Sequence, residues 1–465
     1  MNRTHEQALG VRNGEVSFWW NQIGLRVPRA ALPGDIEADV CIVGAGYTGL
    51  WTAYYLKRLD PALRVVVVEA RFAGYGASGR NGGWLAGTVT GGRERYEKSH
   101  GRQSAIDHQR ALNDTVDEVL AVIAAEGIDA DAVKSGEFRV ARTPAQRARL
   151  EAEFRHERDW PGTDLVALDP AEARRRINVE GALAAVWDPH CARIHPAKLA
   201  RGLAEAVEAL GVRVYENTVV HEIGPGRART PQGTVRAQHI VRATEGFTAD
   251  LAAEHRTWLP MNSSMIATAP LPPAVWEQIG WDGYETLGDV AHVYMYAQRT
   301  ADGRIAFGGR GVPYRYGSHV DTDGRTQTRT IEGLTRLLRE FFPAAADVPI
   351  DHAWAGVLGV PRDWAATVGL DRRTGLGWAG GYVGTGVAAT NLAGRTLADL
   401  ILERDTDIVR LPWVGHTARR WEIEPLRWTA VQAIYAAYRF ADLREARGGE
   451  KTAFAARVAN LIAGR

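Results

Sequence analysis

The stretch "ADVCIVGAGYTGLWTAYYL" (residues 38–56) decides the fold, because its spacing changes from strand to helix across a glycine turn. The β-branched run before the glycines is typical of a strand buried on both faces of a parallel sheet. A helix-spaced segment follows, and "RVVVVEA" (64–70) has the composition of a second buried strand. This order of strand, tight turn, helix and strand predicts a parallel βαβ unit.

The turn itself has the GxGxxG spacing of a dinucleotide site, with Gly44, Gly46 and Gly49. The first glycine permits the tight turn, the second lets a pyrophosphate approach the backbone, and the third lets helix and strand pack closely. The helix N-terminus adds free N–H groups and partial positive charge. Glu69 ends the second strand, where a carboxylate binds a ribose diol and disfavours the 2′-phosphate of NADP. An ordinary glycine turn beside a surface glutamate is the alternative, but it does not explain the combined spacing.

A second glycine cluster, "RFAGYGASGRNGGWLAG" (71–87), follows the acid directly and holds six glycines. A domain for NAD would enter another helix here, so this cluster disfavours an NAD-dependent dehydrogenase. A flavin is longer, and its ring can lie against backbone that carries no side chains. A flexible surface loop is the alternative, which Trp84 and Leu85 oppose. We therefore expect the phosphate–ribityl chain and ring edge to contact Ser78, Arg80, Asn81, Gly82 and Gly83.

Composition restricts the class of protein and the compartment. The 465 residues carry a net charge of +1 and suggest two or three domains, with no signal for a nucleic-acid partner. The two cysteines, Cys41 and Cys191, cannot form a disulfide framework or the usual metal site, so we expect no metal. The sequence shows no secretion signal and no apolar run of membrane-spanning length, so we expect a cytoplasmic protein.

The nucleotide-type segments are separated in the chain, which predicts two interleaved domains. The fold class is α/β, with a Rossmann-like FAD-binding domain, a mixed-sheet α+β substrate domain and a helical C-terminal tail. "AHVYMYAQR" (291–299) and "RIAFGGRG" (304–311) are expected strands of the substrate domain, and "HPAKLARGLAEAVEAL" (195–210) is an expected helix. The predicted ranges are an N-terminal arm at 1–35, FAD-binding segments at 36–100, 186–250 and 346–405, substrate-domain segments at 101–185 and 251–345, and the tail at 406–465.

Three stretches carry a family resemblance: "GAGYTGLWTAYYL", "EARFAGYGASGRNGGW" and the late "GGYVGTGVAATNLAGRTLADLIL". They resemble the D-amino-acid oxidase superfamily of FAD-dependent amine oxidoreductases, particularly its gamma-glutamylputrescine oxidoreductase-like branch. The resemblance implies that a strand "ENTVV" contacts adenine through Val220, that "ATEG" (243–246) closes over the pyrophosphate, and that the late motif begins a helix facing the flavin. The cofactor set is then Gly44, Gly46, Tyr47, Thr48, Gly49, Glu69, Ala70, Arg71, Ser78, Arg80, Asn81, Gly82, Gly83, Val220, Thr244, Gly384, Thr385 and Gly386.

The resemblance implies an enzyme that oxidises the C–N bond of a primary or secondary amine, including polyamine-like amines. The imine product hydrolyses to a carbonyl compound, and dioxygen is the expected electron acceptor. This chemistry requires no acid–base dyad, so no catalytic residue is nominated. The expected walls of the substrate pocket are Tyr294 and Tyr296 on one strand face, Arg310, His352 with Trp354, and Tyr382.

Departures from relatives bear on the substrate and the cofactor linkage. Residues 82–92 contain no basic residue, whereas relatives that oxidise N-methyl amino acids hold the carboxylate with an arginine there. This favours an amine over an amino acid. The chain has five lysines and none within 251–345, where a lysine over the flavin would activate dioxygen. Arg80 and Asn81 occupy the region of a flavin-linking histidine in some relatives, so FAD is expected to be non-covalent.

Two other functions remain open from the sequence. The first is a flavin dehydrogenase that passes electrons to a quinone or a protein. The tail segment "PLRWTAVQAIYAAYRFADLREAR" (425–447) could then dock on a membrane surface, although a helix that covers the core fits it better. The second is an interaction subunit that FAD merely stabilises, which the intact glycine motifs at both ends disfavour.

Overall fold

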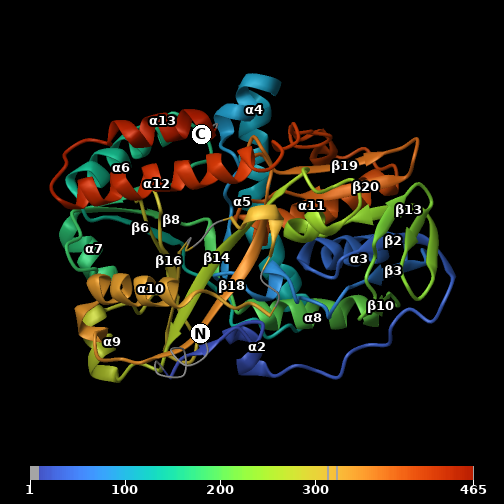
Figure 1. Ribbon diagram of the computed structural model, residues 1–465, viewed down its shortest axis with the longest axis horizontal. Coiled ribbons are helices and arrows are strands. Elements are labelled where there is room, and N and C mark those ends of the chain that lie inside the picture. Colours follow the sequence, from blue (N-terminus) through green and yellow to red (C-terminus); the bar gives the residue numbers. More distant parts are fainter. Residues whose placement is uncertain (1–9, 310, 312–313, 321–322, 464–465) are drawn as a thin grey trace.

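Two large sheets stand side by side in the computed structural model, which describes residues 10–309, 311, 314–320 and 323–463 (Figure 1). The first is eight-stranded and parallel at its centre, in the order β10-β3-β2-β13, with β20 also pairing β13. Its central strands are buried because helices cover one face, while β11, β12 and the segments at Leu32 and Val220 cover the other. Its strands are β2 (Ile36–Val43), β3 (Val65–Val68), β10 (Arg213–Tyr215), β11 (Glu222–Gly224), β12 (Arg227–Arg229), β13 (Thr234–Arg242), β19 (Thr367–Asp371) and β20 (Leu376–Gly380).

Helices with small-residue faces pack against this sheet. Cys41 lies in β2 and is fully buried, as the strand pattern predicts. His195 accepts a hydrogen bond from the backbone N–H of Lys198 and caps α8, with Pro196 as the first helical residue, which confirms the predicted helix start. The helices on this side are α3 (Tyr47–Leu59), α5 (Arg102–Ala125), α8 (Pro196–Ala209) and α11 (Gly386–Ile401).

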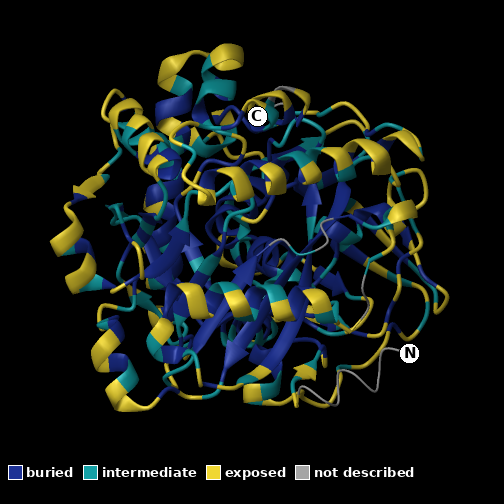
Figure 2. Ribbon diagram, turned by 60° about the vertical axis from the view of Figure 1, so that its left-hand side comes forward, coloured by how far each residue is buried: buried dark blue, intermediate teal, exposed yellow. Residues whose placement is uncertain are grey.

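The second sheet is nine-stranded and mixed, in the order β1-β18-β14-β17-β16-β15-β6-β8-β7. In Figure 1 its longest strands, β14 and β18, run through the middle of the molecule. Figure 2 shows both sheets buried, while the outer faces of the surrounding helices are exposed. Its strands are β1 (Arg12–Asn13), β6 (Glu137–Ala141), β7 (Val166–Leu168), β8 (Ala184–Asp188), β14 (Leu259–Thr268), β15 (Thr286–Asp289), β16 (Tyr296–Arg299), β17 (Ile305–Gly309) and β18 (Ile350–Val360).

The remaining elements connect or cover the two sheets. A three-stranded sheet of β4 (Trp84–Ala86), β9 (Cys191–Arg193) and β5 (Val133–Lys134) lies between them. The remaining α-helices are α2 (Phe18–Ile23), α4 (Arg93–His100), α6 (Pro144–Glu157), α7 (Pro170–Arg176), α9 (Pro273–Ile279), α10 (Thr328–Phe341), α12 (Leu426–Ala446) and α13 (Phe454–Ala463). The 3₁₀ turns are η1 (Ala77–Gly79), η2 (Glu245–Asp250), η3 (Tyr316–Ser318), η4 (Pro343–Ala345) and η5 (Asp407–Arg410). The architecture confirms the α/β class, the mixed second sheet and the C-terminal helices.

One row of side chains crosses the nine-stranded sheet on the face turned toward the eight-stranded sheet. The Cα partners along this row are Arg139, Gly288, Tyr296, Gly308, Met265 and Trp354, each opposite the next. Residues that are directly opposite share a face of the sheet. Trp354 fixes the direction of that face, because its indole N–H donates to the carbonyl of Arg80 in the second glycine cluster, 2.8 Å away.

Two expected strands are wrong in part. The strand predicted over 291–299 forms only from Tyr296, because side chains take the backbone N–H groups before it. Asp442 accepts from His292 and Val293, and Asp289 accepts from Met295, at 2.9–3.0 Å. The segment "ENTVV" (216–220) is irregular instead of extended, and its turn passes through Asn217 at φ +50°.

The predicted ranges do not coincide with the sheets. β18 lies within the range 346–405 expected for the FAD-binding domain, yet it pairs with β14 in the other sheet. The N-terminal arm is built into the core, since Trp19 is 1% exposed and β1 pairs with β18. The tail is helical from Leu426, whereas 411–425 is irregular. Helix α12 buries Val431, Tyr435 and Tyr438 against the body of the protein.

Candidate active site

A cavity of about 460 Å³ lies between the two sheets, at the carboxyl ends of β2 and β3. This is where open α/β sheets bind nucleotides. The predicted residues that line it are Gly44, Gly46, Tyr47, Thr48, Glu69, Ala70, Arg71, Ser78, Asn81, Val220, Thr244, Tyr382, Gly384 and Gly386. Segments from three parts of the chain therefore meet at one cavity.

The first glycine turn has the geometry that a pyrophosphate needs. Gly44 has φ +108°, and a Cβ there would lie 2.5 Å from the carbonyl oxygen of Ala243. A Cβ on Gly46 would meet only the hydroxyl of Ser78, at 3.0 Å, so this glycine leaves space on the cavity side. Gly49 does not line the cavity. A Cβ there would lie 1.9 Å from the carbonyl oxygen of Gly44, so it serves the packing of α3 on β2.

Glu69 is held at the end of β3 by backbone donors. Its two carboxylate oxygens accept from the N–H groups of Ala45 and Arg71, at 2.8 and 2.9 Å. Burial raises the pKa of Glu69, and these backbone bonds oppose that rise. The irregular segment beside it is fixed by the N–H of Thr218, which donates to the carbonyl of Glu69 at 2.8 Å and so places Val220 on the cavity wall.

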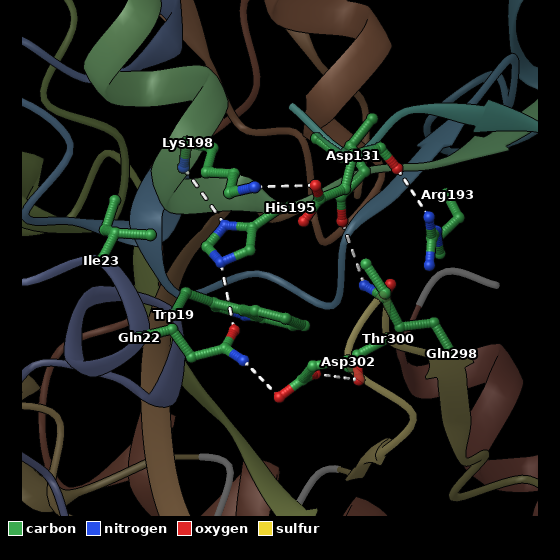
Figure 3. Close-up of a pocket in the computed structure, with 12 residues that line it drawn as sticks. Trp19, Gln22, Ile23, Asp131, Arg193, His195, Lys198, Gln298, Thr300 and Asp302 are labelled. Carbon is green, nitrogen blue, oxygen red and sulfur yellow. Dashed lines mark hydrogen bonds and ion pairs between the residues drawn. The ribbon is translucent and has the colours of Figure 1, made fainter. Parts of the chain in front are cut away.

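The loop Asn81–Gly83 is held by residues that line a second cavity, of about 350 Å³, which is drawn in Figure 3. Three residues that line this second cavity donate to three consecutive carbonyls of the loop. The indole of Trp19 donates to Asn81, the amide of Gln298 to Gly82 and the backbone of Ile194 to Gly83, at 2.7–2.9 Å. Figure 3 also shows a hydrogen-bond chain from the N–H of Lys198 through His195, Gln22 and Asp302 to Thr300. The arm helix α2 thus fixes the loop from the side away from the first cavity.

Three predicted residues of this cluster lie off the cavity wall. A Cβ on Gly82 would lie 2.9 Å from the ring of Tyr296, and one on Gly83 would lie 1.9 Å from the amide of Gln298. Arg80 is 2% exposed, donates to the carbonyls of Tyr75 and Ala355, and stacks on the ring of Tyr75. Their placement suits them to shape the loop between the sheets.

The late glycine loop completes the opposite end of the cavity. The hydroxyl of Tyr382 lies 3.0 Å from that of Thr48 in the first turn of α3, so the two glycine motifs are hydrogen-bonded to each other. Thr385 caps α11 through its backbone, while its hydroxyl donates to the carbonyl of Tyr382 and lies 2.6 Å from that of Thr90. The first amides of α11 have no side-chain cap and lie at the positive end of the helix dipole.

Sequence reasoning missed Glu245, which lies where the two sheets meet. Its carboxylate accepts from the N–H of Gly359 in β18 at 3.0 Å and from that of Gly381 in the late loop at 2.8 Å. Burial raises the pKa of Glu245 to about 7. The signal was present in "ATEG", where an acid follows a buried strand beside the expected phosphates. Other lining residues that were missed include Tyr75, Gly76, Thr218, Phe247, Asp250, Val320, Val357, Leu358, Val387 and Thr390.

The expected substrate residues separate into three groups. Tyr382 lines the cavity, whereas Tyr296 does not: its ring lies against Gly82, and its hydroxyl is 2.8 Å from that of Ser263. Tyr294 precedes β16 and is not on its strand face. Trp354 and His352 are buried against the arm residue Phe18, with ring centroids 5.9 and 6.2 Å from it, and do not line the cavity. Arg310 lies outside the described residues.

These features fit FAD. The cradle at Gly46, the buried acid at Glu69 and the uncapped start of α11 are spaced along one elongated cavity. Of the lining residues that the structure describes, none is a cysteine or histidine, the side chains that carry covalently linked flavins. These lining residues therefore fit an FAD that is bound without a covalent link, as the sequence predicts. Fold and site together define a flavoprotein oxidoreductase with a dinucleotide-binding sheet and a separate mixed sheet.

Comparison with known proteins identifies the family. The family model "FAD dependent oxidoreductase" (DAO) matches residues 39–400, so the chain belongs to that family and requires FAD. The chain is 31% identical over 419 residues to gamma-glutamylputrescine oxidoreductase of Escherichia coli (strain K12), covering 88% of this chain and 94% of that protein. It is 30% identical over 393 residues to the probable oxidoreductase OrdL of Rhizobium meliloti (strain 1021), covering 81% and 86%.

Solved structures show the same fold. Glycine oxidase from Geobacillus kaustophilus superimposes with a TM-score of 0.65 at 22% identity, covering 82% of this chain and all of the other. The family model and the curated relatives make the protein an FAD-dependent oxidoreductase of amines or amino acids. Within the described ranges, no helix combines the length and the apolar character needed to cross a membrane.

Proposed function

We propose that this protein oxidises the C–N bond of an amine to an imine that hydrolyses to a carbonyl compound, with dioxygen as the electron acceptor. The observation that carries the amine assignment is the charge of the cavity wall. Of its described lining residues, Arg71 is the sole arginine or lysine, and it adjoins Glu69 at the adenine end. Val320, Val357, Leu358 and Tyr382 also line the cavity, and none of them offers a cation to a substrate carboxylate.

FAD supplies the two-electron acceptor chemistry when bound. The residues of the chain hold the reactants in position and provide the electrostatic environment of the reaction. Val357 and Leu358 exclude water beside the reacting carbon, which strengthens electrostatic interactions there. The first amides of α11 face the end of the site where negative charge accumulates, and their dipole stabilises that charge. Tyr382 is held by Thr48 and fixes the late loop in this position.

The test is an anaerobic absorbance titration of the purified holoprotein with γ-glutamylputrescine, putrescine, n-butylamine, sarcosine and glycine. We expect the amines to bleach the flavin band and the two amino acids to leave it unchanged. Readmission of air should restore the band within the turnover time. Bleaching by sarcosine or glycine alone would overturn the amine assignment. A flavin band that stays bleached in air would show that dioxygen is not the electron acceptor and would favour a quinone or a protein.

A further inference from the structure

The large apolar side chains that are exposed in the described part of the chain are concentrated near the C-terminus. Of the fourteen such residues, eight lie beyond residue 420, in and beside the helices α12 and α13. They are Ile423, Leu426, Trp428, Phe440, Leu443, Phe454, Val458 and Ile462. Figure 1 shows α12 and α13 side by side along the outside of the molecule. Single exposed apolar residues are ordinary, but a concentration of them marks an interaction surface.

On α12 the exposed side chains form one row along the helix. Its members follow one another at intervals of three or four residues, and each of them is exposed: Leu426, Thr429, Ala433, Ala436, Phe440 and Leu443. Residues with this spacing lie on the same face of a helix. The large side chains stand at the two ends of the row, where Leu426 is 63%, Phe440 58% and Leu443 60% exposed. One whole face of α12 is therefore apolar and turned to solvent.

The opposite face of α12 fixes the helix on the body of the protein. Asp442 accepts from the N–H groups of His292 and Val293, at 2.9 and 3.0 Å. Glu445 forms an ion pair with Arg149 of α6, at 2.9 Å. Both acidic residues of α12 are thus turned inward, and the apolar row is the outer face of a helix that is held in place.

The outer face of α12 is also cationic. Arg439 and Arg444 are exposed, as is Arg447 at the end of the helix. Arg439 precedes Leu443 by four residues and Arg444 follows Phe440 by four, so the two guanidinium groups border the apolar row. Arg447 follows Leu443 by four and continues the row. The exposed face therefore combines apolar side chains with positive charge and carries no acidic residue of the helix.

Charge decides which partner fits this face. The ion pairs that the structure describes for α12 are made by Arg427 and Glu445, which are both buried, so no described acid neutralises the exposed arginines. A second copy of this chain would bring the same positive charges together across a two-fold axis. An anionic bilayer offers the opposite charge at its headgroups and an apolar layer directly below them.

We propose that the outer face of α12 docks this protein on the surface of a membrane that contains anionic phospholipid. Leu426, Phe440 and Leu443 enter the boundary between headgroups and acyl chains, while Arg439 and Arg444 extend to the phosphates. The helix lies on the bilayer without crossing it, because its inner face stays packed on the protein. The proposal does not depend on the amine oxidation, since no described residue of α12 lines the FAD cavity.

The test is flotation of the purified holoprotein with lipid vesicles, with the flavin absorbance reporting the bound fraction. One set of vesicles contains equal parts of phosphatidylglycerol and phosphatidylcholine, and the other contains phosphatidylcholine alone. We expect at least tenfold stronger binding to the anionic vesicles at low salt, because each basic residue near such a surface strengthens binding about fivefold. High salt should weaken this binding, since the arginines are exposed and screened.

Two variants separate the apolar and the cationic contributions. Leu443→Glu and the double variant Arg439→Gln with Arg444→Gln should each bind the anionic vesicles at least tenfold more weakly than the wild-type protein. Val27→Glu is the matched control, because Val27 is 91% exposed but lies in the N-terminal arm, and it should bind as the wild type does. All substituted side chains are exposed, so the flavin absorbance and the Tm of each variant should stay unchanged.

Three results would overturn the proposal. Equal binding to both kinds of vesicle would mean that anionic lipid is not recognised, and unchanged binding of both α12 variants would place the contact elsewhere on the protein. Binding to neither kind of vesicle would leave an acidic protein surface as the partner. Light scattering covers the remaining occupant: we expect the wild-type protein to show the same mass as Leu443→Glu. A larger wild-type assembly that Leu443→Glu dissociates would assign the face to a second copy of the chain.

Discussion

The glycines of the first turn have different structural roles, and matched substitutions to alanine can distinguish cofactor binding from helix packing. Gly46 has an ordinary φ of −79°, and its Cβ position meets only the Ser78 hydroxyl, so Gly46→Ala should leave the apoprotein stable. The added methyl group would stand where the pyrophosphate approaches. We expect at least tenfold weaker FAD binding in a fluorescence titration of apoprotein.

Gly49→Ala is the contrasting change, because its Cβ would lie 1.9 Å from the carbonyl oxygen of Gly44. Overpacking of this kind costs about 1–3 kcal/mol. Urea unfolding of the apoprotein should show that loss for Gly49→Ala and a change below about 0.5 kcal/mol for Gly46→Ala. Equal destabilisation by the two substitutions would refute the division of roles.

His108 is a buried histidine whose polarity no described residue satisfies. It is 1% exposed between the rings of Tyr96 and Trp413, and neither ring nitrogen has a described partner. Burial lowers its pKa from 6.5 to about 3. The unfolded chain therefore takes up a proton below pH 6.5 while the folded protein does not, so stability is lost as the pH falls.

We expect His108→Phe to stabilise the protein by about 1–3 kcal/mol at pH 8, because an unsatisfied polar ring is replaced by an apolar one. At pH 5 the gain should be larger by about 2 kcal/mol, which is the proton uptake that the variant avoids. Chemical denaturation at both pH values measures this difference. His100→Phe, at an exposed position, should show neither gain, and a gain that does not grow at pH 5 would contradict the argument.

At the scale of elements, the contact between α3 and α11 brings the two glycine motifs together. Gly394 in α11 lies against α3, where a Cβ would be 2.7 Å from that of Trp51 and 2.8 Å from the backbone of Thr52. Gly394→Ala should push the helices apart and destabilise the protein by about 1–3 kcal/mol. It should also weaken FAD binding, because the Tyr382–Thr48 hydrogen bond depends on this spacing.

Gly333 provides the matched control within another helix. It lies in α10, and a Cβ there would meet nothing within 4 Å. Gly333→Ala should therefore stabilise the protein by about 0.5–1 kcal/mol through helix propensity alone. Thermal unfolding and FAD titration of both variants measure the contrast, and a destabilised Gly333→Ala would show that the packing argument is incomplete.

The sequence predicts elements well where the signal is local. Spacing alone predicted β2, α3, β3 and the helix α8 within 195–210, because hydrophobic period and turn chemistry act within about ten residues. The helix at the late glycine motif, α11, was implied by the family resemblance. Spacing failed at 291–295, since Asp289 and Asp442 compete for backbone donors, and Asp442 is about 150 residues away. The sequence also did not predict the contact between Trp354 and Arg80. The two residues meet because β18, which carries Trp354, pairs with β14 in the nine-stranded sheet and faces the second glycine cluster.

At the scale of the whole molecule, the cofactor and substrate sides depend on each other. β18 belongs to the nine-stranded sheet but contributes Val357 and Leu358 to the wall of the cavity at the end of the eight-stranded sheet. Helix α2 belongs to the N-terminal arm but supports the loop at Asn81. Because such contacts join residues far apart in the sequence, the sequence could predict two interleaved units but not the exchange of elements between them. The domain ranges remain a proposal.

Glu245 is where this dependence can be measured, since one carboxylate bonds η2 to β18 and to the late glycine loop. Its pKa rises from 4.5 to about 7 on folding, because burial disfavours the charged form. Between these values the unfolded chain has lost its proton and the folded chain has kept it. The wild-type apoprotein should therefore lose about 3 kcal/mol relative to Glu245→Gln as the pH rises from 4.5 to 7, and no more above that. Urea unfolding of both proteins at pH 5, 6, 7 and 8 tests this. A constant difference across that range would mean that Glu245 is ionised in the folded protein and that the two sheets are joined by a buried charge.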